Sequence, residues 1–343
     1  MILDSNGSWR PLPVRLLAQK PSLAQVLEHA TLIAPSLQGL NEYMYELAER
    51  DPNAFMSRGV GSEGTAKFAA SIAAWHLHGR QSMRVSPPLF DALRSTSLDH
   101  VPTALLRSPY PSMWIESGDE GFIVVDQRLL GFFLHESETG REPLFDPLVK
   151  HGILAPGVRV LGVGLFSVLS LHLSLYLTKP SLVESFDDSI RINDEVTRRW
   201  GHPECQLQDE AAFMREAFAL VANLLLYLSS PDPDIQPVMP PGLGRPPKSA
   251  KARGIQETIR RREGAGIAVG YRLTRVTRPS QPQASADPAS AASNSSPRVH
   301  LVRGHWKRQP HGPSLSERKV IWVAPYRRGD DGMEETLERT YDL

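Results

Sequence analysis

The hydrophobic pattern divides this chain into a helical first part and a strand-rich middle. Before residue 101, apolar residues recur at the spacing of a helix; they are Leu37, Leu40, Tyr43, Met44, Leu47, Phe68, Ile72 and Trp75. Ser62 is a suitable N-cap for the second of these helices. We therefore expect residues 1–100 to form a mainly helical N-terminal region.

Short apolar runs replace the helical pattern after Val101. The predicted strands are 113–116, a pair at 121–125 and 130–134, and two more within 158–178. Strands that follow one another without helices between them favour an antiparallel or mixed sheet. We therefore expect an α+β fold, with a mixed or mainly antiparallel sheet and residues 101–343 as its α+β core.

One long helix is predicted after Asp209, which is a suitable N-cap. Its buried stripe contains Phe213, Ala217, Leu220, Val221, Leu224 and Leu228. A Pro-rich loop follows at 231–254, and a further strand is predicted at 267–273. Residues 279–297 are rich in Ser, Ala and Pro, so we expect them to be a flexible insertion.

The last two apolar runs flank a Gly/Pro/Ser loop, which is typical of a β-hairpin with a long connection. Basic and aromatic residues alternate along both runs, which are 299–309 and 319–329. Because strand residues alternate between faces, Arg303 and His305 are expected opposite Trp306. The sequence therefore predicts a C-terminal basic β-hairpin.

The charges are unevenly distributed, although the net charge of the 343 residues is zero. Residues 245–328 hold 18 Lys and Arg but only 4 Asp and Glu, a balance of +14, and the rest of the chain carries −14. The two parts either neutralise each other in the fold or leave a basic surface for nucleic acid or an acidic partner.

Neither a secretory signal nor a membrane span is predicted. Residues 160–178 lack formal charges, but their second half alternates Leu with polar residues, as a strand does. The single cysteine, Cys205, excludes an internal disulfide and fits a reducing compartment. We expect a cytoplasmic protein without a membrane partner.

Few residue patterns point to catalysis. Phosphate-binding and dinucleotide glycine loops, a serine nucleophile elbow and zinc-type cysteine pairs are not found in the sequence. We therefore expect no cofactor and no metal, and binding rather than catalysis. His76 and His78 are expected at or near the surface, and the pair Asp187–Asp188 on a solvated helix face.

The hairpin supplies the candidate contacts, which are Arg303, His305, Lys307, Tyr326 and Arg327. Trp306 and Trp322 are expected to be core residues that hold the hairpin to the sheet, because large aromatic side chains are mostly buried.

The histidines of the hairpin allow an alternative. His300, His305 and His311, with nearby cations, could serve as the catalytic group of a metal-independent ribonuclease.

Several blocks of sequence together resemble a family encoded on phages and other mobile elements. The blocks are 109–116 (PYPSMWIE), 223–232 (NLLLYLSSPD), 269–272 (VGYR), 302–306 (VRGHW) and 321–326 (IWVAPY), within residues 100–330. This family is similar to a type V-A anti-CRISPR protein that acts on the biosynthesis of the CRISPR effector nuclease. The resemblance implies recognition of the nascent N-terminal segment of the effector and loss of its message.

Our leading hypothesis is therefore an anti-CRISPR-like binding protein that serves host defence evasion in the cytoplasm of a bacterial host cell. Its expected partner is the nascent polypeptide of a CRISPR effector nuclease or of another host protein, with the ribosome or mRNA as further partners. The alternatives are the ribonuclease and a phage accessory protein without a ligand.

Overall fold

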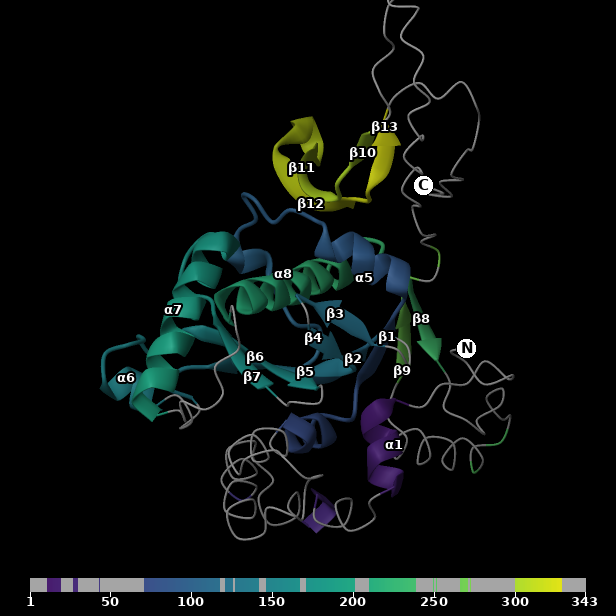
Figure 1. The fold of residues 1–343 in the computed structure, drawn as a ribbon. Coiled ribbons are helices and arrows are strands. Elements are labelled where there is room, and N and C mark those ends of the chain that lie inside the picture. Colours follow the sequence, from purple (N-terminus) through teal and green to yellow (C-terminus); the bar gives the residue numbers. More distant parts are fainter. Residues whose placement is uncertain are drawn as a thin grey trace, which may run out of the picture.

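The computed structural model has a central sheet with helices on both of its faces (Figure 1). The C-terminal β-hairpin projects from one end of the molecule. The structure describes residues 11–19, 27–29, 43, 71–117, 121–125, 127–141, 146–166, 171–200, 210–238, 249, 251, 266–270, 272 and 300–328. The predicted insertion at 279–297 and most of the predicted N-terminal helices lie outside these residues.

A seven-stranded mixed sheet forms the centre of the molecule, in the order β7-β6-β5-β2-β1-β9-β8. Strand β1 runs parallel to β2 and β9, and the other neighbours are antiparallel. The strands are β1 (Ser82–Val85), β2 (Ser112–Glu116), β5 (Gly131–Glu138), β6 (Arg159–Phe166), β7 (Leu171–Tyr176), β8 (Ile235–Val238) and β9 (Gly266–Val269). The α+β class and the mixed sheet are confirmed.

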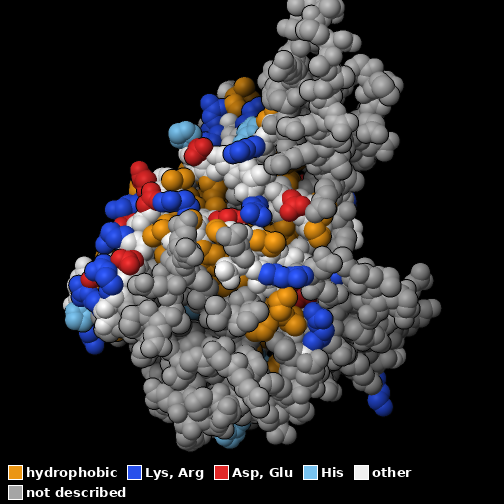
Figure 2. Space-filling view, viewed as in Figure 1, with side chains coloured by type: hydrophobic (Ala, Val, Ile, Leu, Met, Phe, Trp, Pro, Cys, Tyr) orange, Lys and Arg blue, Asp and Glu red, His pale blue; other side chains and the backbone are white. Residues whose placement is uncertain are grey.

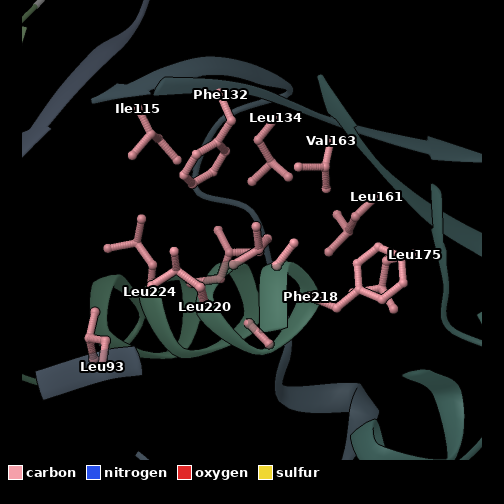
Figure 3. Packing of buried hydrophobic residues seen from close by; sticks show 14 of the residues in the cluster. Leu93, Ile115, Phe132, Leu134, Leu161, Val163, Leu175, Phe218, Leu220 and Leu224 are labelled. Atoms are coloured by element: carbon pink, nitrogen blue, oxygen red, sulfur yellow. The ribbon is translucent and has the colours of Figure 1, made fainter. Parts of the chain in front are cut away.

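Helix α8 (Glu210–Leu228) packs against one face of this sheet. Its Phe218, Leu220 and Leu224 lie opposite apolar side chains of β2, β5, β6 and β7 (Figure 3). The predicted stripe is confirmed from Phe213 to Leu224, and Leu228 is half-buried. The helix is buried over more of its circumference than predicted, because Leu93 of α5 (Pro87–Arg94) packs on its other side.

Helix α8 is also long and apolar enough to cross a membrane by length and composition alone, over Ala211–Leu228. In the structure 67% of this window is buried inside the protein, as in the core helix of a globular domain.

The opposite sheet face is covered by the helical residues 71–77. Ile72 and Trp75 are buried there, as the helical pattern predicts. The rings of Trp114 and Phe133 lie 4.7 Å apart, and Trp75 meets Phe133 edge-on at 6.3 Å. An aromatic cluster therefore closes this side of the core.

The expected pairing of 121–125 with 130–134 is wrong. Strand β3 (Phe122–Val124) instead pairs with β4 (Gln127–Leu129), across a tight turn in which Val125 has φ 51°. The next residues form β5, which pairs with β2 and β6. The first five residues of β5 are all buried, so that strand belongs inside a sheet covered on both faces.

Several elements were not predicted. Strand β1 and helix α5 precede residue 101 and yet belong to the central sheet and core, and β8 lies within the expected Pro-rich loop. Helix α7 (Leu182–Trp200) carries the acidic pair expected on a helix face. The remaining short elements are α1 (Leu12–Gln19), η2 (Thr103–Leu105) and α6 (Asp146–Lys150).

Candidate recognition surface

The C-terminal β-hairpin is confirmed, and it is split into two short ladders. Its strands are β10 (His300–Val302), β11 (His305–His311), β12 (Glu317–Val323) and β13 (Tyr326–Arg328), with η5 (Pro313–Leu315) at the tip. Strand β11 pairs with β12, and β10 pairs with β13. The chain bends between the ladders at Arg303–Gly304 and Ala324–Pro325, so each ladder is a separate two-stranded ribbon.

Two indole groups fix the hairpin to the core. Trp306 Nε1 donates a hydrogen bond to Oδ1 of Asn223 at 2.7 Å. Asn223 is fully buried in α8, and its Nδ2 donates to the carbonyl oxygens of Leu93 and Thr96, each at 3.0 Å. The amide of Asn223 thus hydrogen bonds both to backbone carbonyls at the C-terminal end of α5 and to the indole of the hairpin. A buried polar group with all of these bonds made favours one arrangement of the segments that it joins.

Trp322 makes the second anchor. Its Nε1 donates to Oγ1 of Thr96 at 3.2 Å, and its ring meets Tyr227 edge-on with centroids 5.2 Å apart. The expectation that both tryptophans hold the hairpin is thus confirmed, but the two side chains are half-buried at the edge of the core and attach the hairpin to helix α8 and the end of α5, not to the sheet. The reason is that α8 covers the sheet face on which the hairpin would otherwise rest.

The bend at Gly304 also requires close contact with the core. The Gly304 carbonyl accepts a hydrogen bond from the backbone N–H of Ser97 at 3.2 Å. A Cβ added at Gly304 would lie 2.5 Å from Oγ1 of Thr96. Only glycine lets the hairpin approach the end of α5 this closely.

The cations of the hairpin are accessible. Arg303 and Lys307 are exposed, and His305 is half-buried with its Nδ1 3.3 Å from the Arg303 carbonyl oxygen. Blue and pale-blue side chains gather over the hairpin in the upper part of Figure 2, to the left of the grey residues. Among the described residues, the ion pairs lie elsewhere, and neither Arg303 nor Lys307 takes part in one.

The predicted contact residues fall into two groups. His305 and Lys307 are two positions apart on β11 and share the face opposite Trp306, as the alternation predicts. Tyr326 is half-buried and aligned with Val302, whereas Arg327 is aligned with Leu301 and therefore belongs to the other face of the β10–β13 ribbon. The side chain of Arg327 lies outside the described residues. Their contact with a partner stays a prediction.

Three further cations belong to the same ribbon, although they were not among the predicted contacts. Arg308 and Arg318 are exposed and Lys319 is half-buried, and Lys319 is aligned with Gln309. In the part of the chain that the structure describes, these side chains form no ion pair either. The signal for them was the run of cations on both sides of the predicted loop.

The three histidines of the ribonuclease hypothesis are not gathered into one site. His305 begins β11 and His311 ends it, so they are separated by about 20 Å along the strand at the usual rise per residue. His300 is aligned with Arg328 on the other ladder. Among the described residues, no group of three or more His, Cys, Asp or Glu is arranged to hold a metal ion.

The clearest pKa shifts lie away from the hairpin, on the sheet face opposite α8. Burial lowers the pKa of His135 to about 4, with a smaller contribution from the nearby His78. Burial also lowers the pKa of His78, and it lowers that of His76 to about 4, where Arg80 adds to the effect. His76 and His78 are half-buried, as expected.

This chain can be compared with known protein sequences, structures and families. No curated protein sequence matches this chain. Among solved structures, the crystal structure of AcrVA2 is similar, with a TM-score of 0.46 and 13% sequence identity over 92% of this chain and 95% of that chain. The AcrVA2-like family, described as the anti-CRISPR type V subtype A2 family, matches residues 83–327. That match includes all but the first residue of the sheet and all but the last residue of the hairpin, and it identifies this chain as a member of the AcrVA2-like anti-CRISPR family.

Proposed function

We propose that this protein binds the nascent N-terminal segment of a type V-A CRISPR effector nuclease and lowers the expression of that nuclease. Family membership supports the anti-CRISPR role. The observation that carries the binding proposal is the hairpin, whose exposed Arg303 and Lys307 form no ion pair with any residue that the structure describes. The hairpin is fixed to the core by Trp306 and Trp322.

A fixed ribbon suits an extended partner for a physical reason. A nascent segment is unfolded, so it loses conformational entropy when it binds. A recognition surface that is already ordered does not add a second entropy loss. Exposed cations also attract acidic chains over a distance of about 10 Å at moderate salt.

The place of action follows from the partner. A nascent chain is accessible only at the ribosome, so the protein acts in the bacterial cytoplasm. The same basic surface would be attracted to ribosomal or messenger RNA through counterion release. Such attraction would keep the protein near the message that it is proposed to reduce.

A pull-down from translating cells with intact ribosomes tests the proposal. We expect the wild type to retain ribosomes that carry the nuclease message, and the double variant Arg303→Ala/Lys307→Ala to lose them while keeping its fold. Arg191→Ala/Arg198→Ala is a matched control, because it removes two exposed arginines from α7. Equal retention by the wild type and the hairpin variant would refute the assignment of the contact surface.

A second readout separates peptide binding from RNA binding. Puromycin releases nascent chains from ribosomes, so it should release a nascent-chain reader but not an RNA binder. No specific observation favours the ribonuclease alternative, because His305 and His311 lie at opposite ends of β11.

A further inference from the structure

An extended chain can join a protein by hydrogen bonding to the free edge of a sheet. The central sheet has two outer strands, β7 and β8, and the β11–β12 ribbon has two more edges. Each edge can be judged by asking where its outward backbone N–H and C=O groups go.

The β7 edge is already occupied by side chains of α7. The amide of Asn193 accepts from the Ser174 N–H at 3.2 Å and donates to its carbonyl oxygen at 2.7 Å. The hydroxyl of Ser189 likewise accepts from the Tyr176 N–H at 2.8 Å and contacts its carbonyl oxygen at 3.2 Å. Helix α7 thus replaces a neighbouring strand and closes this edge.

The β8 edge lacks a backbone N–H donor at Pro237. Gly270 N–H donates to the Asp234 carbonyl at 2.8 Å, so this aligned pair is hydrogen-bonded. Antiparallel pairs alternate between bonded and non-bonded types, so Ile235 and Pro237 turn their backbone groups outward. Proline has no N–H, and its ring obstructs an approaching strand. This edge is therefore a poor template.

The same alternation of bonded and non-bonded pairs shows which backbone groups of the β11–β12 ribbon point outward. Pro310 is aligned with Arg318 and cannot donate, so that pair is of the non-bonded type. The pairs Arg308–Val320 and Trp306–Trp322 are then also of this type. A second observation agrees, because the Gly304 carbonyl points away from β12 and accepts from Ser97.

The two hairpin edges differ as a result. Strand β11 is bridged by Ser97 at its start and carries Pro310 near its end. Strand β12 turns the N–H and C=O groups of Arg318, Val320 and Trp322 outward. Among the described residues, none hydrogen bonds to these backbone groups. Of these four edges, β12 offers an uninterrupted row of donors and acceptors. The β3–β4 and β10–β13 ribbons have strands of only three residues each, so their edges are too short for such a row.

We propose that β12 is the strand to which the partner adds, and that the partner segment is an extended acidic peptide. This inference rests on the proposed function and names the chemistry of its ligand. Charge complementarity selects the acidic sequence, because β12 itself carries Arg318 and Lys319, and Arg308 is aligned with its Val320. The sequence of residues 300–328 contains a single acidic residue, Glu317. A peptide strand beside β12 would present alternate side chains to the two faces of the ribbon.

The test removes one backbone donor and leaves the ribbon intact. In Val320→Pro the lost N–H is an outward one, so the ladder with β11 is preserved, and Pro310 shows that this ribbon accommodates proline at an outward position. Val320→Thr is the matched control, since it keeps the N–H and the β-branched shape. The probe is a set of fluorescein-labelled peptides that tile the N-terminal segment of a type V-A effector nuclease, each with a version in which Asp and Glu are replaced by Asn and Gln.

We expect Val320→Pro to bind the acidic peptide about tenfold more weakly or worse, and Val320→Thr to bind it like the wild type. The amide-substituted peptides should also bind weakly. Hydrogen exchange of the wild type should show new protection of the Arg318, Val320 and Trp322 amides when peptide is added, a readout that does not depend on how the variant folds.

Three results would overturn the inference in distinguishable ways. Wild-type affinity in Val320→Pro, or no new amide protection in β12, would refute strand addition while the proposed function stands. Undiminished binding of the amide-substituted peptides would refute the acidic preference. If the wild type binds none of the peptides but retains RNA, the proposed function fails and this inference fails with it.

Discussion

Trp306 and Asn223 lie 83 residues apart in the sequence and are joined by a hydrogen bond of 2.7 Å. The same asparagine also donates to the carbonyls of Leu93 and Thr96. This amide therefore connects three segments of the family match, which are the end of α5, the core helix α8 and the hairpin. The hairpin can act as a recognition element because this junction fixes its position.

Replacing Asn223 should therefore cost more stability than replacing its hairpin partner. Asn223→Leu leaves the buried Thr96 carbonyl and the Trp306 indole N–H without partners, whereas the Leu93 carbonyl keeps the bond from the Thr96 N–H. We expect a loss of about 3 kcal/mol. Trp306→Phe removes only the N–H and part of the ring, and should cost about 1–2 kcal/mol. Urea unfolding of both variants measures the difference, and equal losses would mean that Asn223 does not connect the three segments.

Helix α7, whose side chains hydrogen bond to the outer edge of β7, should also prevent self-association through that edge. Asn193→Ala leaves both the N–H and the carbonyl of Ser174 unsatisfied. Ser189→Ala leaves the Tyr176 N–H unsatisfied, while the Tyr176 carbonyl keeps the bond from the Thr178 N–H. Each change should cost about 1–2 kcal/mol. Self-association should increase, because an open edge pairs with other chains. Arg191→Ala on the same helix removes only an exposed ion pair and should change stability by less than about 0.5 kcal/mol. Sedimentation and thermal unfolding, compared with this control, check both effects.

Acid should destabilise the fold before its carboxylates are protonated. The pKa of buried His135 is about 4 in the folded protein, against its usual 6.5. The unfolded chain therefore takes up a proton first, so stability is full above pH 6.5 and falls as the pH drops toward 4. The loss due to His135 is up to about 3 kcal/mol, and His76 changes in the same direction.

His135→Gln should make the pH dependence shallower, whatever its effect on the stability at neutral pH. Unfolding free energies measured from pH 7 to pH 4 give this slope. An unchanged slope would show that His135 is not kept neutral by burial.

Gly162 and His135 are aligned on neighbouring strands, and the ring of His135 fills the space that a side chain at position 162 would need. A Cβ on Gly162 would lie 2.2 Å from Nε2 of His135, so Gly162→Ala should cost about 2 kcal/mol or more. The cost should largely disappear in a His135→Ser background, where the space is free. A double-mutant cycle measures this coupling, and additive effects would contradict the contact.

Local pattern determined much of this protein. The strands 112–116, 159–166 and 171–176, the helix 210–228 and the C-terminal hairpin are specified by residue period and by turn residues close to them in sequence. The basic character of the hairpin is likewise a property of composition. The blocks that carry the family resemblance were also visible in the sequence alone.

Only the tertiary structure decided which elements meet. The pairing of β5 with β2 and β6 depends on burial of both its faces, which a local pattern does not encode. The docking of Trp306 on Asn223, rather than on the sheet, depends on α8 already covering that sheet face. The open β12 edge follows from the way the ribbon bends at Gly304 and from which strands are left without neighbours. Contacts between residues far apart in sequence set all of these features, because the free energy of packing is shared by many side chains at once.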